Sequence, residues 1–321
     1  MTTLHDDLPH PVPGYAHLRY KENYFFILMA PRSDAFGVFH LNHEPGHDRA
    51  RYTGNFRIGG RSIDYGNRTG FPADFVHARR IGDGRLSLAF VRPHQSFDLT
   101  LETGDISLDL RFEARFATFD YAACQTAGNP APSFQETMTL GLNLPYNHQQ
   151  QALTAKGSAR FADGTTILID GMGYRDHSWV MRADVATREH DWCGFNFPSR
   201  AFGIKTLETM MRSGIRAKEG YVADAEGLRA LRRIETTRTG RQSDGLCETL
   251  IHEVEDVFGQ RYRIESDVAG RFAHVPLASE EPSGASGYHI VENFCPATCA
   301  GETGVGLVEI GRNSAIAEPF T

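Results

Sequence analysis

Cysteine is scarce in this 321-residue chain, which contains Cys124, Cys193, Cys247, Cys295 and Cys299. Their number is odd and their spacing is wide, which favours reduced thiols over a disulfide framework. Cys295 and Cys299 are separated by three residues, and no second pair of this kind follows them, so the metal signal is weak. The sequence therefore predicts free thiols and no metal ion.

Long apolar runs are also absent. No uninterrupted apolar stretch approaches the roughly 18 residues that a membrane-spanning helix needs. Residues 1–15 contain two Asp and three Pro, and they lack the basic and apolar parts of a secretory signal. We therefore expect a soluble protein of the cytoplasm, with no transmembrane segment.

The chain has no excess of positive charge. Acidic residues number 40 against 33 Lys and Arg, which gives a formal net charge of -7 and no global basic field to hold a phosphate backbone. No phosphate-binding loop is present, and Gly171-Met172-Gly173 lacks the third glycine of a dinucleotide-binding fingerprint. Nucleic acid is disfavoured as a partner and no cofactor is predicted, whereas the oligomeric state stays open.

The most frequent pattern in the sequence is the alternation of apolar and polar residues with a period of two. Apolar and polar residues alternate from Ile106 to Phe116, as is typical of an antiparallel strand with one buried face. Residues 97–101 alternate in the same way, and Thr103-Gly104-Asp105 supplies a turn, so a hairpin is predicted. Two further hairpins are expected, joining residues 157–161 to 165–170 and residues 249–257 to 261–268.

Helical signals are few. Residues 206–212 and 224–233 are the two candidate short helices, although Gly227 weakens the second. A chain of this length made of short strands is typical of an all-β protein with two antiparallel barrels or sandwiches. We place the boundary near Asp170, so that residues 1–170 and 171–321 form the two domains.

The segment from His43 to His47 spells H-E-x-x-H, the helical zinc motif in which two histidines one turn apart share a metal. Pro45 and Gly46 lie inside the stretch that has to be helical, and both residues disfavour a helix. We therefore interpret this segment as a polar loop.

The densest chemistry lies between Gly171 and Arg182, where an acid, an imidazole, an indole and two guanidinium groups occur within twelve residues. The second of the two tryptophans, Trp192, follows soon afterwards, next to Asp191. If residues 175–180 form a regular strand, then Arg175, His177 and Trp179 lie on one face. Asp176 then lies on the opposite face, unless a bulge at the preceding glycines turns it.

A purely structural role is the alternative interpretation of this segment. In that case Asp176 pairs with Arg175 or Arg182, His177 is hydrogen-bonded in a core, and the tryptophans fill volume.

The segment Gly173-Tyr174-Arg175-Asp176-His177-Ser178-Trp179 with Arg182 resembles a motif of the two-domain, lipocalin-like proteins related to carotenoid 1,2-hydratase and AttH, and more closely a branch of unknown function. Softer matches are residues 148–151, Glu292-Asn293-Phe294 and the stretch from Gly304 to Glu309. Two positions depart from the pattern: Val180 stands where the family usually has Gly, and Gln150 stands where it has Glu.

The resemblance implies two lipocalin-like barrels and, for the hydratases, addition of water to an isoprenoid double bond without a cofactor. Protonation of an alkene needs a carboxylic acid that burial keeps neutral, and the carbocation that forms is stabilised by aromatic faces. Asp176 is the first candidate acid and Asp191 the reserve, with His177 orienting the acid or activating water. The candidate substrate-binding residues are Tyr174, Arg175, Trp179, Arg182, Trp192, His148 and Gln151.

We therefore expect a hydratase, dehydratase or double-bond isomerase that acts on an apolar isoprenoid-like or polycyclic molecule. A cyclase with the same acid and aromatic lining is a second possibility, and a lipid or terpenoid carrier without catalysis is a third. The fold alone does not choose among the three.

Overall fold

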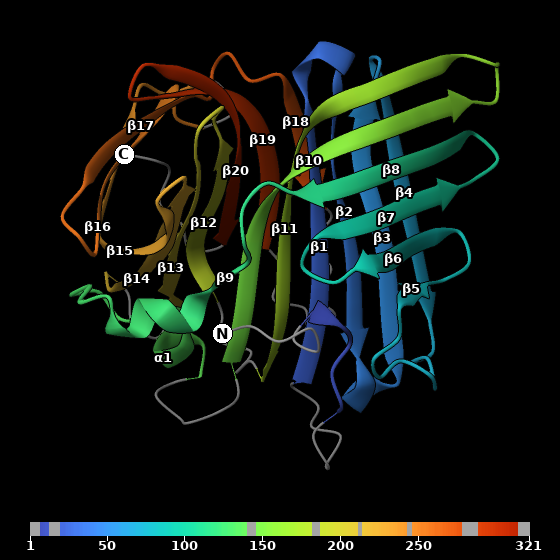
Figure 1. Cartoon of the computed structure of the whole chain (residues 1–321), viewed down its shortest axis with the longest axis horizontal. Coiled ribbons are helices and arrows are strands. Elements are labelled where there is room, and N and C mark those ends of the chain that lie inside the picture. The colour runs from blue at the N-terminus through green and yellow to red at the C-terminus, as the bar shows by residue number, and fades with distance from the viewer. Residues whose placement is uncertain are drawn as a thin grey trace. The chain divides into compact units, whose positions relative to one another are not determined.

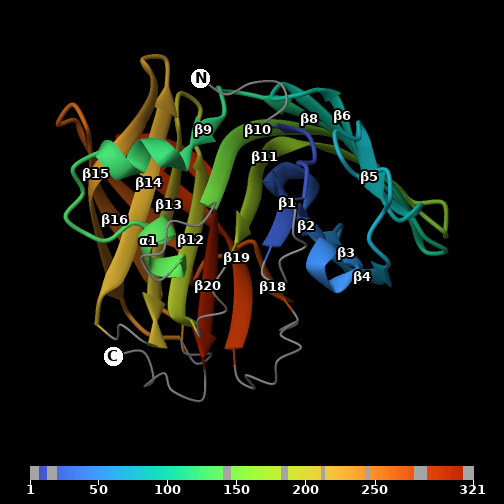
Figure 2. The same cartoon turned by 90° about the horizontal axis from the view of Figure 1, so that it is seen from below.

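The computed structural model describes residues 7–12, 20–139, 146–181, 187–210, 214–242, 246–277 and 288–313 (Figures 1 and 2). The chain divides into two compact units, which we describe separately. Unit 1 consists of residues 1–120 and 144–182, and unit 2 of residues 121–143 and 183–321. Among the described residues, no helix has the length and apolar character needed to cross a membrane.

Unit 1 is built on one antiparallel sheet of eleven strands, in the order β4-β3-β2-β1-β11-β10-β8-β7-β6-β5, with β9 paired to β10. The strands are β1 (Tyr20–Ala30), β2 (Ala35–Glu44), β3 (Arg49–Ile58), β4 (Arg61–Thr69), β5 (Arg80–Gly82), β6 (Leu86–Arg92), β7 (Ser96–Glu102), β8 (Ile106–Ala114), β9 (Phe119–Asp120), β10 (Tyr146–Phe161) and β11 (Thr166–Met181). Short 3-10 turns, Pro31–Ser33 and Pro45–His47, join β1 to β2 and β2 to β3. The sheet curves into a half-barrel (Figure 2).

Unit 2 is a closed barrel. Its strands run in the order β17-β16-β15-β14-β13-β12-β20-β19-β18, and the pairing of β17 with β19 closes eight of them into a ring (Figure 1). The strands are β12 (Thr187–Asn196), β13 (Ala201–Thr209), β14 (Arg216–Asp224), β15 (Gly227–Thr239), β16 (Thr249–Asp256), β17 (Arg261–Asp267), β18 (Ala273–Leu277), β19 (Tyr288–Cys299) and β20 (Glu302–Asn313). The unit also contains the 3-10 segment η4 (Tyr121–Thr126) and helix α1 (Phe134–Met138).

The predicted all-β architecture is confirmed, as are the three hairpins, which are β7–β8, β10–β11 and β16–β17. The five cysteines are free thiols and all are buried. Each unit has its own apolar core, rich in phenylalanine in unit 1 and in phenylalanine and aliphatic residues in unit 2. Strands such as β8 and β17 bury one face, as the period of two predicts, whereas β1, β2 and β13 are buried on both faces.

The two predicted helices are wrong. Residues 206–209 belong to β13, and Gly227 begins β15. All nine residues of β13 are buried, and they include the polar residues Lys205, Thr206 and Glu208, so the strand shows no apolar–polar alternation of the kind that marks a half-buried strand. Asp170, where the sequence analysis placed the domain boundary, lies inside β11, and the described part of that strand belongs to unit 1.

The interpretation of the H-E-x-x-H segment as a polar loop is only partly right. Pro45–His47 form a 3-10 turn and not an α-helix, so the zinc geometry of that motif is absent. His43, however, lies in β2 and is fully buried, with Nε2 3.3 Å from the hydroxyl of Tyr52. Its imidazole is part of the core of unit 1 and packs on the ring of Phe75.

Candidate functional site

Strand β11 positions most of the predicted site residues of unit 1. It lies between β1 and β10, and its register with both neighbours is continuous from Met172 to Val180. No bulge turns Asp176, so the predicted alternation holds: Arg175 and His177 lie on one face and Asp176 on the other. Gly171 and Gly173 instead allow close packing, because a Cβ at Gly173 would lie 2.6 Å from the ring of Phe112.

Arg175 is fully buried and ion-paired. Its Nη1 donates to Oδ1 of Asp7, and its Nε donates to Oε1 of Gln151 over 2.8 Å. Burial is the largest influence on the pKa of Asp7 and raises it, but the charges of Arg175, His94 and His177 and the backbone N–H of His94 together lower it by more, so the net shift is downward. Arg175 and Gln151, both predicted to bind substrate, thus hold the N-terminal segment against the sheet.

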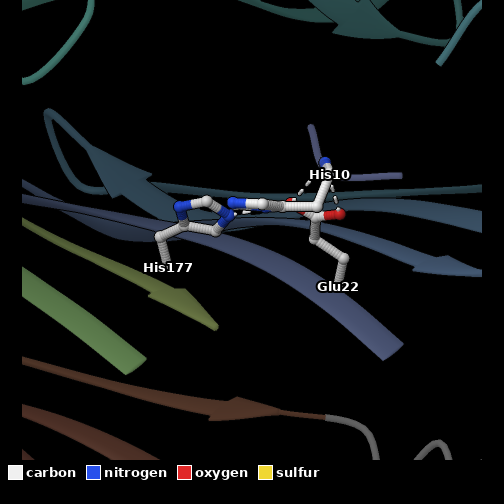
Figure 3. A group of neighbouring side chains, drawn as sticks. All are labelled: His10, Glu22 and His177. Atoms are coloured by element: carbon white, nitrogen blue, oxygen red, sulfur yellow. Dashed lines mark hydrogen bonds and ion pairs between the residues drawn. The ribbon is translucent and has the colours of Figure 1, made fainter. Parts of the chain in front are cut away.

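His177 lies in a second buried group with His10 and Glu22 (Figure 3). Nδ1 of His10 is 2.8 Å from Oε1 of Glu22, and Nε2 of His177 is 2.9 Å from the same oxygen. The backbone N–H of His10 donates to Oε2 of Glu22 over 3.1 Å, and the hydroxyl of Tyr24 donates to Oε1 over 2.8 Å. Both glutamate oxygens are therefore engaged.

Aromatic rings hold the two imidazoles of this group. The ring of Trp179 stacks on that of His10 with centroids 4.0 Å apart, and the ring of Tyr24 stacks on that of His177 at 4.2 Å. The predicted proximity of His177 and Trp179 is confirmed by a centroid separation of 4.7 Å. The indole thus packs on imidazoles and not on an acid.

The electrostatics of this group favour an ionised carboxylate. Burial raises the pKa of Glu22, but the hydrogen bonds from His10 and His177 lower it more, to about 2. Burial also lowers the pKa of His177, although the neighbouring Glu22 carboxylate opposes that shift. Glu22 therefore does not have the un-ionised form that alkene protonation needs.

Asp176 lies on the opposite face of β11 and is partly exposed. Its Oδ2 accepts a hydrogen bond from Nε2 of His148 and another from Nε2 of Gln150, the latter at 2.8 Å. The hydroxyl of Tyr174 donates to Oε1 of Gln150 over 3.0 Å. The structure thus pairs Asp176 with His148. The catalytic scheme expects His177 beside Asp176 and the structural interpretation expects Arg175 there, but these two side chains lie on the opposite face of β11.

Asp191 and Trp192 belong to β12 in unit 2. Asp191 is fully buried, and its Oδ2 accepts hydrogen bonds from Nη2 of Arg238 and, at 3.2 Å, from the hydroxyl of Thr206. Burial is the largest influence on the pKa of Asp191 and raises it, but the charge and hydrogen bond of Arg238, with smaller contributions from His252 and Arg216, together lower it by more, and the net shift is downward. This environment is the opposite of what a neutral acid needs. Arg182 lies outside the described residues.

In unit 2, the side chains of Trp192, Glu309 and Glu292 form a row across the neighbouring strands β12, β20 and β19. Trp192 is the cross-strand partner of Glu309, and Glu309 is the partner of Glu292. Side chains directly opposite one another in an antiparallel pair share a face and have Cβ atoms roughly 5 Å apart. Glu309 is partly exposed and accepts a hydrogen bond from Nε2 of His190.

Glu292 is fully buried, and among the described residues no N–H or hydroxyl group donates to its carboxyl oxygens, whose polar neighbour is the carboxyl group of Glu309. Burial raises its pKa well above the usual value, and the nearby Glu309 carboxylate raises it further. Of the shifted carboxyl pKa values among the described residues, this is the one that moves upward. Glu292 therefore carries a proton at pH values where other carboxyl groups are ionised.

Five residues of these groups are not singled out as functional by the sequence: Asp7, His10, Glu22, Glu292 and Glu309. The first two lie in a short N-terminal segment without periodicity. Glu22 meets His177 across 155 positions of sequence, and no spacing motif records that contact. Glu292 and Glu309 did appear as matches to the hydratase-related proteins, and that match was the signal available.

Comparison with known proteins supports the fold. A family model described as a domain of unknown function, DUF7064, matches residues 3–314. No curated protein matches the chain. An AttH-type protein from Nitrosomonas europaea is similar in structure, with a TM-score of 0.63 at 15% identity, over 96% of this chain and 100% of that one.

Two further solved structures are similar. Kievitone hydratase from Nectria haematococca has a TM-score of 0.58 at 10% identity, over 96% of this chain and 98% of that one. CghA, crystallised with Sch210972, has a TM-score of 0.60 at 11% identity, over 92% and 89% of the two chains. The predicted resemblance to lipocalin-like, AttH- and hydratase-related proteins is thereby confirmed at the level of fold.

Proposed function

This chain belongs to the DUF7064 family, whose description assigns no function, and from that premise we propose that it is an acid–base catalyst acting on a small apolar molecule. The reaction is hydration of a carbon–carbon double bond, its reverse, or migration of the double bond. Similarity in fold to kievitone hydratase supports this class of reaction. The proton donor is the Glu292–Glu309 pair of unit 2.

One observation carries the proposal: a fully buried carboxyl group without a donor to stabilise its charge, next to a second carboxylate. Two carboxyl groups that share a site cannot both ionise easily, so the pair retains one proton at neutral pH. Glu292 holds that proton because it is the more deeply buried member. Glu309, which is partly exposed, is the member that reaches the substrate.

The reaction starts when the shared proton passes to Glu309 and from there to a carbon of the double bond. The carbocation that forms lies against two ionised carboxylates and the indole face of Trp192, and both environments stabilise positive charge. Water then bonds to the cation, and the proton released from that water returns to the pair. Dehydration is the same sequence in reverse. In isomerisation, the cation instead gives a proton from a different carbon atom back to the carboxyl pair, and the double bond forms at a new position.

Asp176 with His148 remains the rival donor, on the basis of the motif in β11. The carboxylate of Asp176 has two hydrogen-bond donors and partial exposure, which suit a base better than a strong acid. His177 engages Glu22 on the opposite face of β11, so it does not orient the carboxyl group of Asp176.

The test is a panel of alkenes and tertiary alcohols, assayed for water exchange and double-bond migration with the wild type, Glu292→Gln, Glu309→Gln and Asp176→Asn. We expect the two glutamate variants to bind ligand normally and to lose about 10²- to 10⁴-fold in turnover. Glu265→Gln, at an exposed position of β17 in the same barrel, is the matched control and retains activity.

Other outcomes assign other functions. If Asp176→Asn loses turnover while both glutamate variants keep it, the donor lies in unit 1 and the present assignment is wrong. If no member of the panel reacts and every variant binds ligand equally, the protein is a carrier. Ring formation without water incorporation indicates a cyclase.

A further inference from the structure

Three potential metal ligands meet in unit 1, and none of them belongs to the proposed acid pair of unit 2. His10 comes from the N-terminal segment, Glu22 from β1 and His177 from β11 (Figure 3). One nitrogen of each histidine and one oxygen of the glutamate all lie within 4.8 Å of one another. We propose that these three residues bind one divalent transition-metal ion, of which zinc is the best match.

The donor set suits such an ion. Imidazole nitrogen and carboxylate oxygen bind zinc at about 2.0–2.2 Å, and three protein ligands leave a fourth position for a solvent or ligand atom. Nδ1 of His10 and Nε2 of His177 are 2.8 and 2.9 Å from Oε1 of Glu22. A tetrahedral ion separates its ligand atoms by roughly 3.4 Å, so each of these two nitrogens has to move only about half an ångström further from the glutamate oxygen.

Charge balance favours an ion at this place. The Glu22 and His177 side chains are fully buried, and the ion-pair partners of Glu22 among the described residues are His10 and His177. An imidazole compensates a carboxylate only when it is protonated, and burying two imidazolium ions is costly. The nearby guanidinium of Arg175 is already committed to Asp7. A divalent cation supplies the charge without protonating either ring.

The surroundings are also those of a prepared site. The rings of Trp179 and Tyr24 stack on the two imidazoles and restrict their rotation. The hydroxyl of Tyr24 donates to the glutamate oxygen and fixes its orientation, as outer hydrogen bonds do around metal ligands. The ion therefore fastens residues 7–12 to β1 and β11, a structural role that is independent of the acid–base function proposed above.

The experiment uses the full, untagged chain, stripped with a chelator and then titrated with Zn²⁺ by calorimetry. We expect one ion per chain and at least a tenfold loss of affinity in His10→Gln and in His177→Gln. His40→Gln, at a partly buried histidine of β2 in the same sheet, is the matched control and keeps wild-type affinity. Absence of stoichiometric uptake, or equal binding by all three variants, overturns the proposal.

A second readout needs no ligand variant. Since Trp179 stacks on His10, a paramagnetic ion such as Co²⁺ bound there quenches the fluorescence of Trp179 strongly. In Trp192→Phe, Trp179 is the one remaining tryptophan, and we expect saturable quenching at one equivalent of Co²⁺ that Zn²⁺ reverses. Co²⁺ that binds without quenching is bound elsewhere, and that result also overturns the proposal.

Discussion

Glu22 in unit 1 and Glu292 in unit 2 are both fully buried glutamates on a strand, yet their pKa values move in opposite directions. Burial is the largest influence on each and raises both. Glu22 receives hydrogen bonds from His10, Tyr24 and His177, and its pKa falls to about 2. Glu292 receives none from an N–H or hydroxyl group of the described residues, its polar neighbour is the carboxyl group of Glu309, and its pKa rises.

The difference shows that burial alone does not decide the charge of a carboxyl group. Hydrogen-bond donors and charges next to its oxygens decide it together with burial. In unit 1, the ionised carboxylates of Asp7 and Glu22 bind the N-terminal segment to the sheet. In unit 2, Glu292 stays protonated, and its burial costs stability. The following variants test that contrast, from the largest expected effect to the smallest.

Arg175→Met removes the guanidinium group that forms an ion pair with Asp7. The aspartate then stays buried without its guanidinium partner, and such a loss costs about 3–5 kcal/mol of the free energy of unfolding. Chemical denaturation at pH 7 measures it. The double variant with Asp7→Asn is the control and should recover most of the loss. A single variant as stable as the wild type would show that the pair contributes nothing.

Glu22→Gln removes the ionised carboxylate of unit 1. Because the folded-state pKa of about 2 lies below the unfolded value, Glu22 stabilises the fold above its unfolded pKa, and this stability is lost as the pH falls toward 2. In metal-free protein we expect a loss of about 3 kcal/mol at pH 7. Denaturation curves between pH 7 and pH 3 check it, and a loss that is independent of pH in this range contradicts the account.

Glu292→Gln should change the free energy of unfolding in the opposite direction to Glu22→Gln. The raised folded-state pKa means that the stability contributed by the neutral acid is complete below its unfolded pKa and is lost as the pH rises toward the folded value. The variant should therefore be more stable than the wild type at pH 7, by about 1 kcal/mol or more, and nearly equal to it near pH 4.5. Thermal unfolding at the two pH values measures the gap, and Glu265→Gln should show none.

Glu309→Gln should give the smallest change in the pH dependence of stability. It removes the charge that repels ionisation of Glu292 but leaves the larger influence, burial, in place. The pKa of Glu292 should fall modestly and stay above its usual value. The pH dependence of stability, compared with that of Glu292→Gln, shows the shift. A return of the Glu292 pKa to its usual value would mean that repulsion, and not burial, governs it.

Local alternation predicted much of this architecture. The period of two located β7 and β8, and it placed Arg175, His177 and Trp179 on one face of β11. It failed in β13, where both faces are buried and no alternation remains to be read. The pattern therefore identified strands such as β8, in which buried residues alternate with more exposed ones, and missed β13 and the start of β15, in which they do not.

The chemistry of the sites depended on contacts that pattern does not encode. Asp176 was the favoured acid because it stands in the densest motif, but its partner, His148, comes from a neighbouring strand. Glu22 and Glu292 show no local sign of their opposite charges, since each is set by residues on other segments. The resemblance to hydratase-related proteins singled out Glu292 and Glu309 without giving them a role.

The most direct test of the central claim is the infrared carbonyl absorption of glutamate side chains at pH 7, taken as the difference between the wild type and Glu292→Gln. We predict a band of a protonated carboxylic acid that the variant lacks. A difference spectrum with only carboxylate bands would show that Glu292 is ionised, and would contradict both its proposed role as proton store and the contrast between the two units.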